Sequence, residues 1–156
     1  MSLAGLQEAV DRILDRGGSD ERILQGVVDA LEEQVEHYSW VGIYVVDGDE
    51  LVLGPWRGPQ ATEHVRIPVG QGVCGAAAAS GATEVVDDVN ADPRYLACFP
   101  STRSEIVVPI FEKGIVVGEI DIDSDRPAAF GESDRDVLER IALQIGPHCR
   151  AGVATN

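Results

Sequence analysis

The chain has 156 residues, 44% of them hydrophobic, and a formal net charge of −15 at pH 7. This length and apolar content suit a single domain over residues 1–156, and the acidic charge disfavours nucleic acid and anionic membranes as partners. No run approaches the roughly 18 apolar residues of a membrane span, and "MSLAGLQEAVDRILDRGG" is typical of an amphipathic helix rather than a signal peptide. We therefore expect a cytoplasmic protein.

Two helices are predicted in the N-terminal segment, residues 3–37. Apolar residues recur at helical spacing over 3–16 and again over 20–37, and "RGGSDE" breaks the pattern between them. Ser19 stands where an N-cap of the second helix belongs. The apolar stripe of the second helix is expected to face the core or a dimer partner.

The next segments predict strands joined by tight turns. The run 40–46 is rich in β-branched and aromatic residues, and "DGDE" leads into a return strand over 51–55. Shorter strands are expected over 64–69 and 83–88. Between them, "GQGVCGAAAASG" over 70–81 predicts a turn followed by a short helix that ends at its last glycine.

The clearest strand signal is "SEIVVPIFEKGIVVGEIDIDSD", two β-type runs joined at "EKG" in a long hairpin. It completes an expected sheet core over residues 38–125. An apolar stripe then predicts a C-terminal helix over about 131–150. Because hairpins join most of the strands, the chain is expected to be α+β, with a mainly antiparallel sheet and helices packed on its faces.

The segment "GQGVCG" matches G-x-G-x-x-G after a strand and before a helix. A dinucleotide fold also needs a parallel βαβ unit, which a hairpin-rich chain does not suggest, so nucleotide binding is not favoured. The local interest of the motif is Cys74. Backbone N–H groups and the dipole at a helix N-terminus favour a thiolate, whereas a cysteine packed beside the following alanines is inert. Both interpretations stay open.

Three cysteines, Cys74, Cys98 and Cys149, make an odd count that argues against a disulfide framework. The chain has no CxxC and its histidines do not cluster at metal-ligand spacing, so a structural zinc site is not expected. Cys98 lies in a loop-like run between prolines, near Arg94 and Arg103, whose charges could lower its pKa. It is either a reactive thiol or a small buried hydrophobe. Cys149, near the C-terminus, is expected to be inert.

Three carboxylates are expected to meet on the long hairpin. Asp121 and Asp123 share a strand face because they are two residues apart, and Glu105 opens the partner strand. This is either a solvated face or, given the apolar neighbours, a buried cluster that suits a cationic amine or a metal. Trp40 and Tyr44 also share one strand face, as core aromatics or as a cage for an alkyl or cationic group.

Four segments together resemble one family: "GPWRG" (54–58), "GQGVCGAAA" (70–78), "LACFPSTRSEIVVPI" (96–110) and "GEIDIDSD" (118–125). They are similar to the free methionine-R-sulfoxide reductases, which are single-domain members of the GAF superfamily. The resemblance covers roughly residues 38–145 in order. It implies a GAF-like central antiparallel sheet of about six strands flanked by helices on both faces, and often a homodimer.

The resemblance also implies roles for individual residues. The family's catalytic cysteine, seven residues before the glutamate of "SEIVVP", is Cys98 here, and its "GVCG" cysteine is Cys74. A protonated Glu105 would donate to the sulfoxide oxygen. No metal or organic cofactor is implied. The side chains implied to hold free methionine-(R)-sulfoxide are those of Trp40, Tyr44, Glu105, Asp121 and Asp123.

The implied reaction is thiol-dependent reduction of this substrate. The Cys98 thiolate attacks the sulfoxide sulfur, Cys74 condenses with the resulting sulfenic acid to a disulfide, and a dithiol such as thioredoxin resets the pair. The chain departs from the family at two places: His64 occupies the position of a third cysteine, and "DPRYLACF" (92–99) replaces "FPGHIACD". The alternative is therefore a non-catalytic GAF sensor or regulatory module that binds a small ligand.

Overall fold

The computed structural model describes residues 3–96 and 99–151. Its centre is a six-stranded sheet in the order β3-β2-β1-β6-β5-β4, in which every neighbouring pair is antiparallel. The elements are α1 (Leu3–Arg16), α2 (Asp20–Gln34), β1 (Trp40–Asp47), β2 (Glu50–Arg57), β3 (Arg66–Pro68), α3 (Gly72–Ser80), β4 (Glu84–Val86), η1 (Val89–Ala91), β5 (Ser104–Glu112), β6 (Ile115–Ser124), α4 (Glu132–Ile145) and η2 (Gly146–His148).

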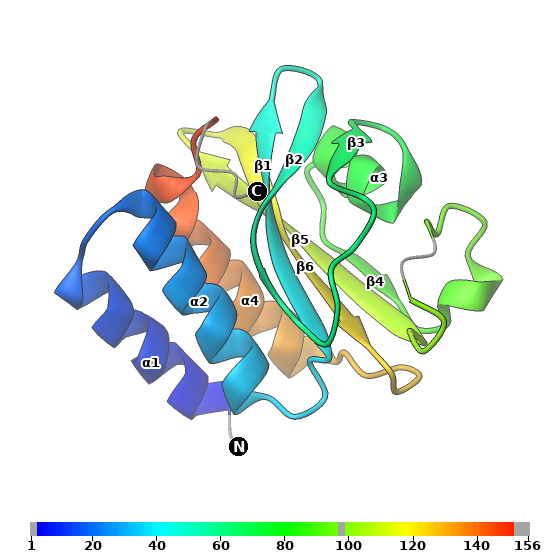
Figure 1. Cartoon of the computed structure of the whole chain (residues 1–156), viewed down its shortest axis with the longest axis horizontal. Coiled ribbons are helices and arrows are strands. Elements are labelled where there is room, and N and C mark those ends of the chain that lie inside the picture. Colours follow the sequence, from blue (N-terminus) through cyan, green and yellow to red (C-terminus); the bar gives the residue numbers. More distant parts are fainter. Residues whose placement is uncertain (1–2, 97–98, 152–156) are drawn as a thin grey trace.

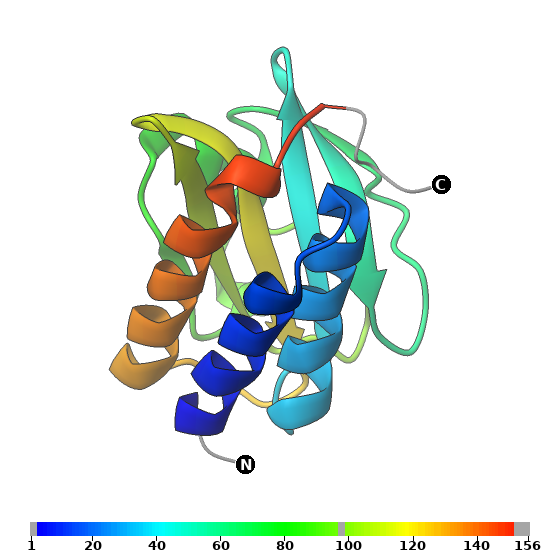
Figure 2. The same ribbon diagram turned by 90° about the vertical axis from the view of Figure 1, so that its left-hand side faces the viewer.

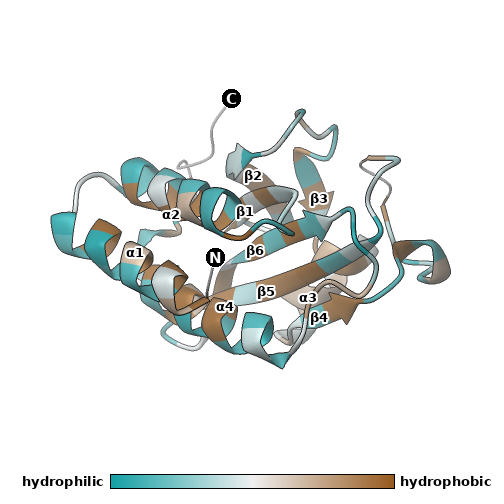
Figure 3. Cartoon of the chain, turned by 90° about the horizontal axis from the view of Figure 1, so that it is seen from below, coloured by the Kyte–Doolittle hydropathy of each residue, from teal (hydrophilic) through white to brown (hydrophobic). Residues whose placement is uncertain are grey.

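Helices cover both faces of the sheet. The three long helices α1, α2 and α4 lie side by side on one face, and α3 lies on the other (Figures 1 and 2). Hydrophilic and hydrophobic residues alternate around α1 and α2, whereas β5 is mainly hydrophobic (Figure 3). The predicted α+β fold, with an antiparallel sheet of about six strands flanked by helices on both faces, is confirmed. None of the helices in the described ranges combines the length and apolar content that a membrane crossing requires.

Two helices are shorter than the sequence suggests. Helix α2 begins as predicted, with the Ser19 hydroxyl accepting from the Arg22 N–H at 3.2 Å, but it ends at Gln34 because Val35 is extended. Helix α4 ends at Ile145 instead of continuing to about residue 150. Pro147 has no N–H to continue the helical ladder, and the chain forms the 3₁₀ turn η2.

Successive side chains of each central strand point to opposite faces of the sheet and pack in two separate hydrophobic cores. Alternate residues of β1, β5 and β6 point toward the three long helices, as Ile43, Val108 and Ile120 do, and are fully buried there. The intervening residues, among them Trp40 and Val107, face α3 and the loops around it. All candidate site residues of the sheet lie on this second face.

The strand register brings these residues together from distant parts of the chain. Strand β1 pairs with β6, so that Trp40 lies opposite Asp123 and Gly42 opposite Asp121. Strand β5 pairs with the other edge of β6 and places Glu105 opposite Asp123. Directly opposite residues of an antiparallel pair point to the same face. Two strands that are separate in sequence therefore flank the aspartates of β6 on both sides.

Candidate functional site

The three predicted carboxylates converge on the α3 side of the sheet and are nearly inaccessible. Glu105 is 5% exposed, Asp121 is 3% exposed and Asp123 is 2% exposed. The expectation that they meet is confirmed, and the alternative of a solvated strand face is wrong. Carboxylates this deeply buried are costly unless a cation or a proton compensates them.

A fourth carboxylate joins them that sequence reasoning missed. Glu119 follows the same two-residue period as Asp121 and Asp123, lies opposite Tyr44 of β1, and is fully buried. Among the described residues, neither of its carboxylate oxygens has a hydrogen-bond partner. The signal was present in "GEIDID", where acidic residues occupy every second position of an otherwise apolar strand.

Burial controls the protonation of this cluster. Loss of water raises the pKa of Glu119 and of Asp123 well above their usual values, and the nearby Asp121 charge raises both further. Burial also raises the pKa of Asp121, although hydrogen bonds with Glu105 and Cys74 and the charge of His64 act in the opposite direction. The cluster therefore holds protons that exposed carboxyl groups would release.

Cys74 lies in the first turn of α3 and points at these carboxylates. Its sulfur, a Glu105 oxygen and an Asp121 oxygen all lie within 4.8 Å of one another. Burial, followed by the charges of Asp121, Glu119 and the other two carboxylates, raises the pKa of the thiol well above its usual value. Desolvation and the four acids therefore oppose the thiolate that the helix N-terminus favours at Cys74.

The glycines of "GQGVCG" allow the backbone to turn and neighbouring residues to pack closely against it. Gly72 has φ +70°, and a β-carbon there would lie 2.7 Å from Cδ1 of Leu96, so the glycine lets Leu96 approach. The N–H group of Gly70 is used within the loop, since it donates to the Gly75 carbonyl at 2.8 Å. The strand pairs of the described sheet are all antiparallel. The part of the sheet that the structure describes therefore contains no parallel βαβ unit, the context that a dinucleotide-binding motif needs.

Two predicted aromatic residues lie on the same face as the carboxylates. The Trp40 ring stacks on Trp56 with centroids 6.2 Å apart and is 6.1 Å from Phe99. Its indole Nε1 is buried without a hydrogen-bond partner in the part of the chain that the structure describes. The Tyr44 hydroxyl donates to the backbone carbonyl of His64 at 2.7 Å, which fixes the loop that carries this histidine.

His64, one of the two departures from the family pattern, lies in the site. Its charge acts on Asp121, and its side chain lines a small cavity beside Cys74. The cavity measures about 10 Å³, which is room for one water molecule or one ion. A ligand as large as an amino acid enters only if lining side chains move. The lining residues are Tyr44, His64, Ile67, Val73, Cys74, Leu96, Glu105 and Asp121.

Cys98 lies outside the described residues, so its predicted place beside Cys74 stays a prediction. The neighbouring Arg94 bonds to Asp92 at 2.7 Å and to Glu84 at 2.9 Å, which leaves its charge compensated by two carboxylates. This pairing weakens the expectation that Arg94 lowers the pKa of Cys98.

Phe99 marks the other departure from the family pattern, and it is buried against Trp40. It therefore closes one side of the aromatic cluster. The residue that the family pattern has there is aspartate, so this part of the site is apolar in the present chain.

Cys149 lies on the opposite face of the sheet. It packs in the core beneath the three long helices, where burial and the charge of Asp20 raise its pKa to about 12. This agrees with the expectation that it is inert.

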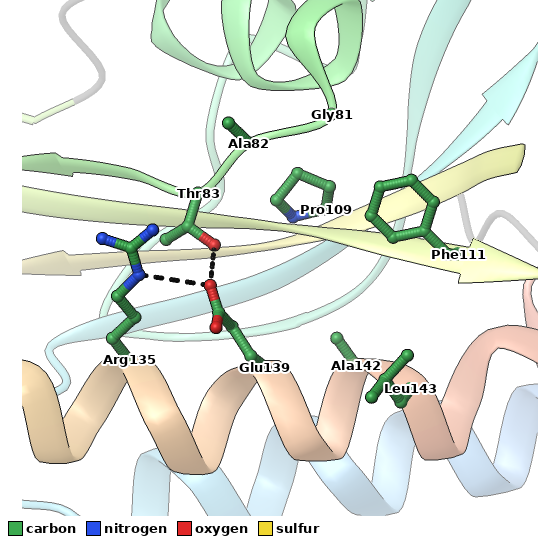
Figure 4. Close-up of a pocket in the computed structure, with 9 residues that line it drawn as sticks. All are labelled: Gly81, Ala82, Thr83, Pro109, Phe111, Arg135, Glu139, Ala142 and Leu143. Carbon is green, nitrogen blue, oxygen red and sulfur yellow. Dashed lines mark hydrogen bonds and ion pairs between the residues drawn. The ribbon is translucent and has the colours of Figure 1, made fainter. Parts of the chain in front are cut away.

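A separate groove of about 320 Å³ lies between the end of α3, β5 and α4 (Figure 4). Its polar side chains satisfy one another: Thr83 donates to Glu139 at 2.6 Å, and Arg135 pairs with the same carboxylate at 3.2 Å. Within the described residues, the groove thus brings together one hydroxyl, one carboxylate and one guanidinium that bond to one another. The groove is lined by Gly81, Ala82, Thr83, Pro109, Phe111, Arg135, Glu139, Ala142 and Leu143.

Comparison with known proteins shows which family the chain resembles. The GAF domain model matches residues 20–148. The chain is 43% identical over 119 residues to GAF domain-containing protein A of Dictyostelium discoideum, covering 76% of this chain and 73% of that one. It is 38% identical over 115 residues to the free methionine-R-sulfoxide reductase of Escherichia coli K12, covering 74% and 68%. The structure of a free methionine-R-sulfoxide reductase from Neisseria meningitidis in complex with its substrate superimposes with a TM-score of 0.84 at 40% identity, covering 94% and 89%.

Proposed function

Because the chain belongs to the GAF domain family and, within it, to the free methionine-R-sulfoxide reductases, we propose that it reduces free methionine-(R)-sulfoxide to methionine at the expense of thiols. The observation that carries the proposal is the buried meeting of Cys74 with Glu105 and Asp121, whose reactive atoms lie within 4.8 Å of one another. A free amino acid supplies the ammonium group that such a cluster needs, whereas a methionine within a polypeptide does not.

The carboxylates divide into two tasks. Asp121 and Asp123 accept hydrogen bonds from the substrate ammonium, which compensates charges that the fold keeps from water. Glu105, in its protonated form, donates to the sulfoxide oxygen and so favours attack at the sulfur. Trp40 and Tyr44 flank the carboxylates from β1 and enclose the apolar end of the substrate.

The chemistry runs through two cysteines. The Cys98 thiolate attacks the sulfoxide sulfur, the oxygen passes to Cys98, and methionine leaves with two electrons from the thiol. The Cys74 thiol then attacks the Cys98 sulfenic acid, a disulfide forms and water departs. A dithiol protein such as thioredoxin reduces that disulfide and completes the cycle. No metal or organic cofactor takes part.

The small cavity sets a condition for substrate entry. About 10 Å³ beside Cys74 does not hold an amino acid, so the lining side chains move apart when the substrate binds. Leu96, which packs on Gly72 at the wall of the cavity, is one of them.

We also propose a homodimer, which light scattering of the purified chain at several concentrations would test.

Turnover tests the proposal directly. We would supply free methionine-(R)-sulfoxide with dithiothreitol or a thioredoxin system and count the methionine formed, with the (S) epimer in a parallel reaction. Turnover of the (R) epimer that is lost in Cys98→Ser and kept in Cys149→Ser supports the reductase. The Cys149 variant is the matched control because that thiol is buried on the other face of the sheet.

A chain that forms no more methionine than its Cys98→Ser variant would instead be the non-catalytic sensor module. That alternative predicts a small ligand whose binding does not depend on Cys98. Mass spectrometry of peptides after one turnover separates the steps, since the proposal requires a Cys74–Cys98 disulfide. Persistent sulfenic acid at Cys98 without that bond would contradict the role of Cys74.

A further inference from the structure

Three metal-binding atoms meet in this site, and each comes from a separate element. The Cys74 sulfur comes from α3, a Glu105 oxygen from β5 and an Asp121 oxygen from β6, and all lie within 4.8 Å of one another. In sequence these residues are far apart, which is why a search for closely spaced cysteines and histidines does not find them. One thiolate and two carboxylates amount to three protein ligands, the number that open zinc sites use.

Unpaired acceptors surround these three residues. Oδ1 of Asp121, Oδ1 of Asp123 and both oxygens of Glu119 are buried, and none has a hydrogen-bond partner among the described residues. The three side chains are 3%, 2% and 0% exposed. Buried acceptors that protein donors leave unsatisfied are costly, and a cation satisfies several of them at once.

The free space between the ligands fits a single ion. The cavity bounded by Cys74, Glu105 and Asp121 measures about 10 Å³, the volume of one water molecule or ion. Zinc binds thiolate sulfur at about 2.3 Å and carboxylate oxygen at about 2.0–2.2 Å. Modest inward movement of donors that already lie within 4.8 Å of one another therefore brings all three to bonding distance and leaves the fourth position open. The same closed geometry has no room for an amino acid.

The ligand types select the metal. A sulfur ligand favours Zn²⁺ and related borderline ions, whereas Mg²⁺ and Ca²⁺ prefer shells of oxygen. We propose that Cys74, Glu105 and Asp121 form a binding site for Zn²⁺ that excludes the sulfoxide substrate. Zn²⁺ binds the Cys74 sulfur as a thiolate, and the thiol proton leaves to solvent.

The proposed zinc ligands are also residues of the proposed reductase site, so zinc binding is expected to regulate turnover. This regulation rests on the proposed function. A bound ion occupies Asp121, which the substrate ammonium needs, and Glu105, which the sulfoxide oxygen needs. It also blocks the Cys74 thiol that resolves the sulfenic acid. Zn²⁺ is therefore expected to inhibit turnover reversibly, and a chelator is expected to restore it.

Metal binding is measured without turnover, so the two proposals fail separately. Chain reduced with a phosphine is dialysed against Zn²⁺ and the bound metal is counted; one ion per chain is expected. Co²⁺ in place of Zn²⁺ is expected to show the near-ultraviolet charge-transfer absorption of a thiolate ligand. Cys74→Ser should abolish this absorption and weaken binding at least ~10-fold, the size of effect seen even for outer-shell partners.

Matched variants identify the thiol. Cys149→Ser removes another buried cysteine from the opposite face and should leave both stoichiometry and absorption unchanged. Substoichiometric binding to the wild-type chain, or thiolate absorption that survives Cys74→Ser, overturns the site. Zinc binding without sulfoxide turnover would support the metal site and reject the reductase. Sulfoxide turnover without zinc binding would support the reductase and reject the metal site.

Discussion

Glu105 and Asp123 lie directly opposite each other across β5 and β6, and both side chains are almost completely buried. Like charges in a directly opposed pair destabilise a sheet, and removal from water adds to the cost. Burial raises the pKa of Asp123 well above its usual value, so removal from water favours the protonated form of this carboxyl group and lowers the cost. The sheet thus gives up stability to hold an acidic pocket.

The first prediction concerns stability against pH. Glu119 has a raised folded-state pKa, so the native state keeps a proton that the unfolded chain releases above a pKa of 4.5. The free energy of unfolding therefore falls as pH rises from that value through the folded-state pKa. Glu119→Gln removes this titration and is expected to flatten the fall, which urea unfolding at a series of pH values measures.

The control for that prediction is Asp136→Asn, an exposed acid on α4. It removes the same formal charge without removing a buried titration, so its pH profile should follow that of the unmodified chain. A Glu119→Gln profile as steep as the control would contradict the assigned burial effect.

The second prediction concerns recognition of the substrate ammonium. Asp121→Asn removes a charge that accepts from this group, and hydrogen bonds to charged groups are worth about 1.5–3 kcal/mol. The variant should therefore lose about 10- to 150-fold in kcat/KM for methionine-(R)-sulfoxide. A substrate analogue without the amino group provides the comparison. The unmodified chain should discriminate against it strongly and the variant weakly; equal discrimination by both would place the ammonium elsewhere.

The third prediction concerns Gly42, which lets the Trp40 ring approach the backbone of β1 closely. A β-carbon at position 42 would lie 2.7 Å from Cζ3 of Trp40, closer than atoms pack. Gly42→Ala should therefore displace the indole and raise KM more than it lowers kcat, because the reacting cysteines are untouched. Tryptophan fluorescence reports the displaced ring. An unchanged spectrum together with an unchanged KM would show that Trp40 does not shape the pocket.

Local periodicity predicted much of the fold. The two-residue period of "DID" places Asp121 and Asp123 on one face, and the β5–β6 hairpin brings Glu105 to them. The pairing of β1 with β6 is a contact between distant segments, so a strand period alone says nothing about it. Helix ends were less predictable from the sequence. Both α2 and α4 are shorter than predicted, because Val35 is extended and because Pro147 lacks the N–H that would continue α4.

The state of Cys74 shows where sequence reasoning fails. Its position at a helix N-terminus favoured a thiolate, and that local effect is real. The thiol nevertheless has a raised pKa, because the fold buries it against carboxylates of two strands. Desolvation depends on tertiary packing, which no local pattern records. Glu119, in contrast, could have been predicted from the sequence. It lies two residues before Asp121, so the two-residue period of the strand places it on the same face.

The last prediction concerns a residue that stabilises the fold without taking part in the proposed site. The Tyr38 hydroxyl donates to Oδ1 of Asp134 at 2.6 Å, and Oδ2 of the same carboxylate accepts from the Gly131 N–H at 2.9 Å, where α4 begins. Tyr38→Phe leaves a buried carboxylate short of one donor, so it should lower the free energy of unfolding by about 1–3 kcal/mol.

Activity should not change with that loss, because Tyr38 packs in the core beneath the long helices, on the other face of the sheet from Cys74. Urea unfolding and sulfoxide turnover measured on the same preparation test both halves. Asp134→Ala should cost more than Tyr38→Phe, since it also removes the acceptor at the N-terminus of α4. A drop in kcat for Tyr38→Phe at a temperature where the chain is fully folded would mean that the two faces of the sheet are coupled.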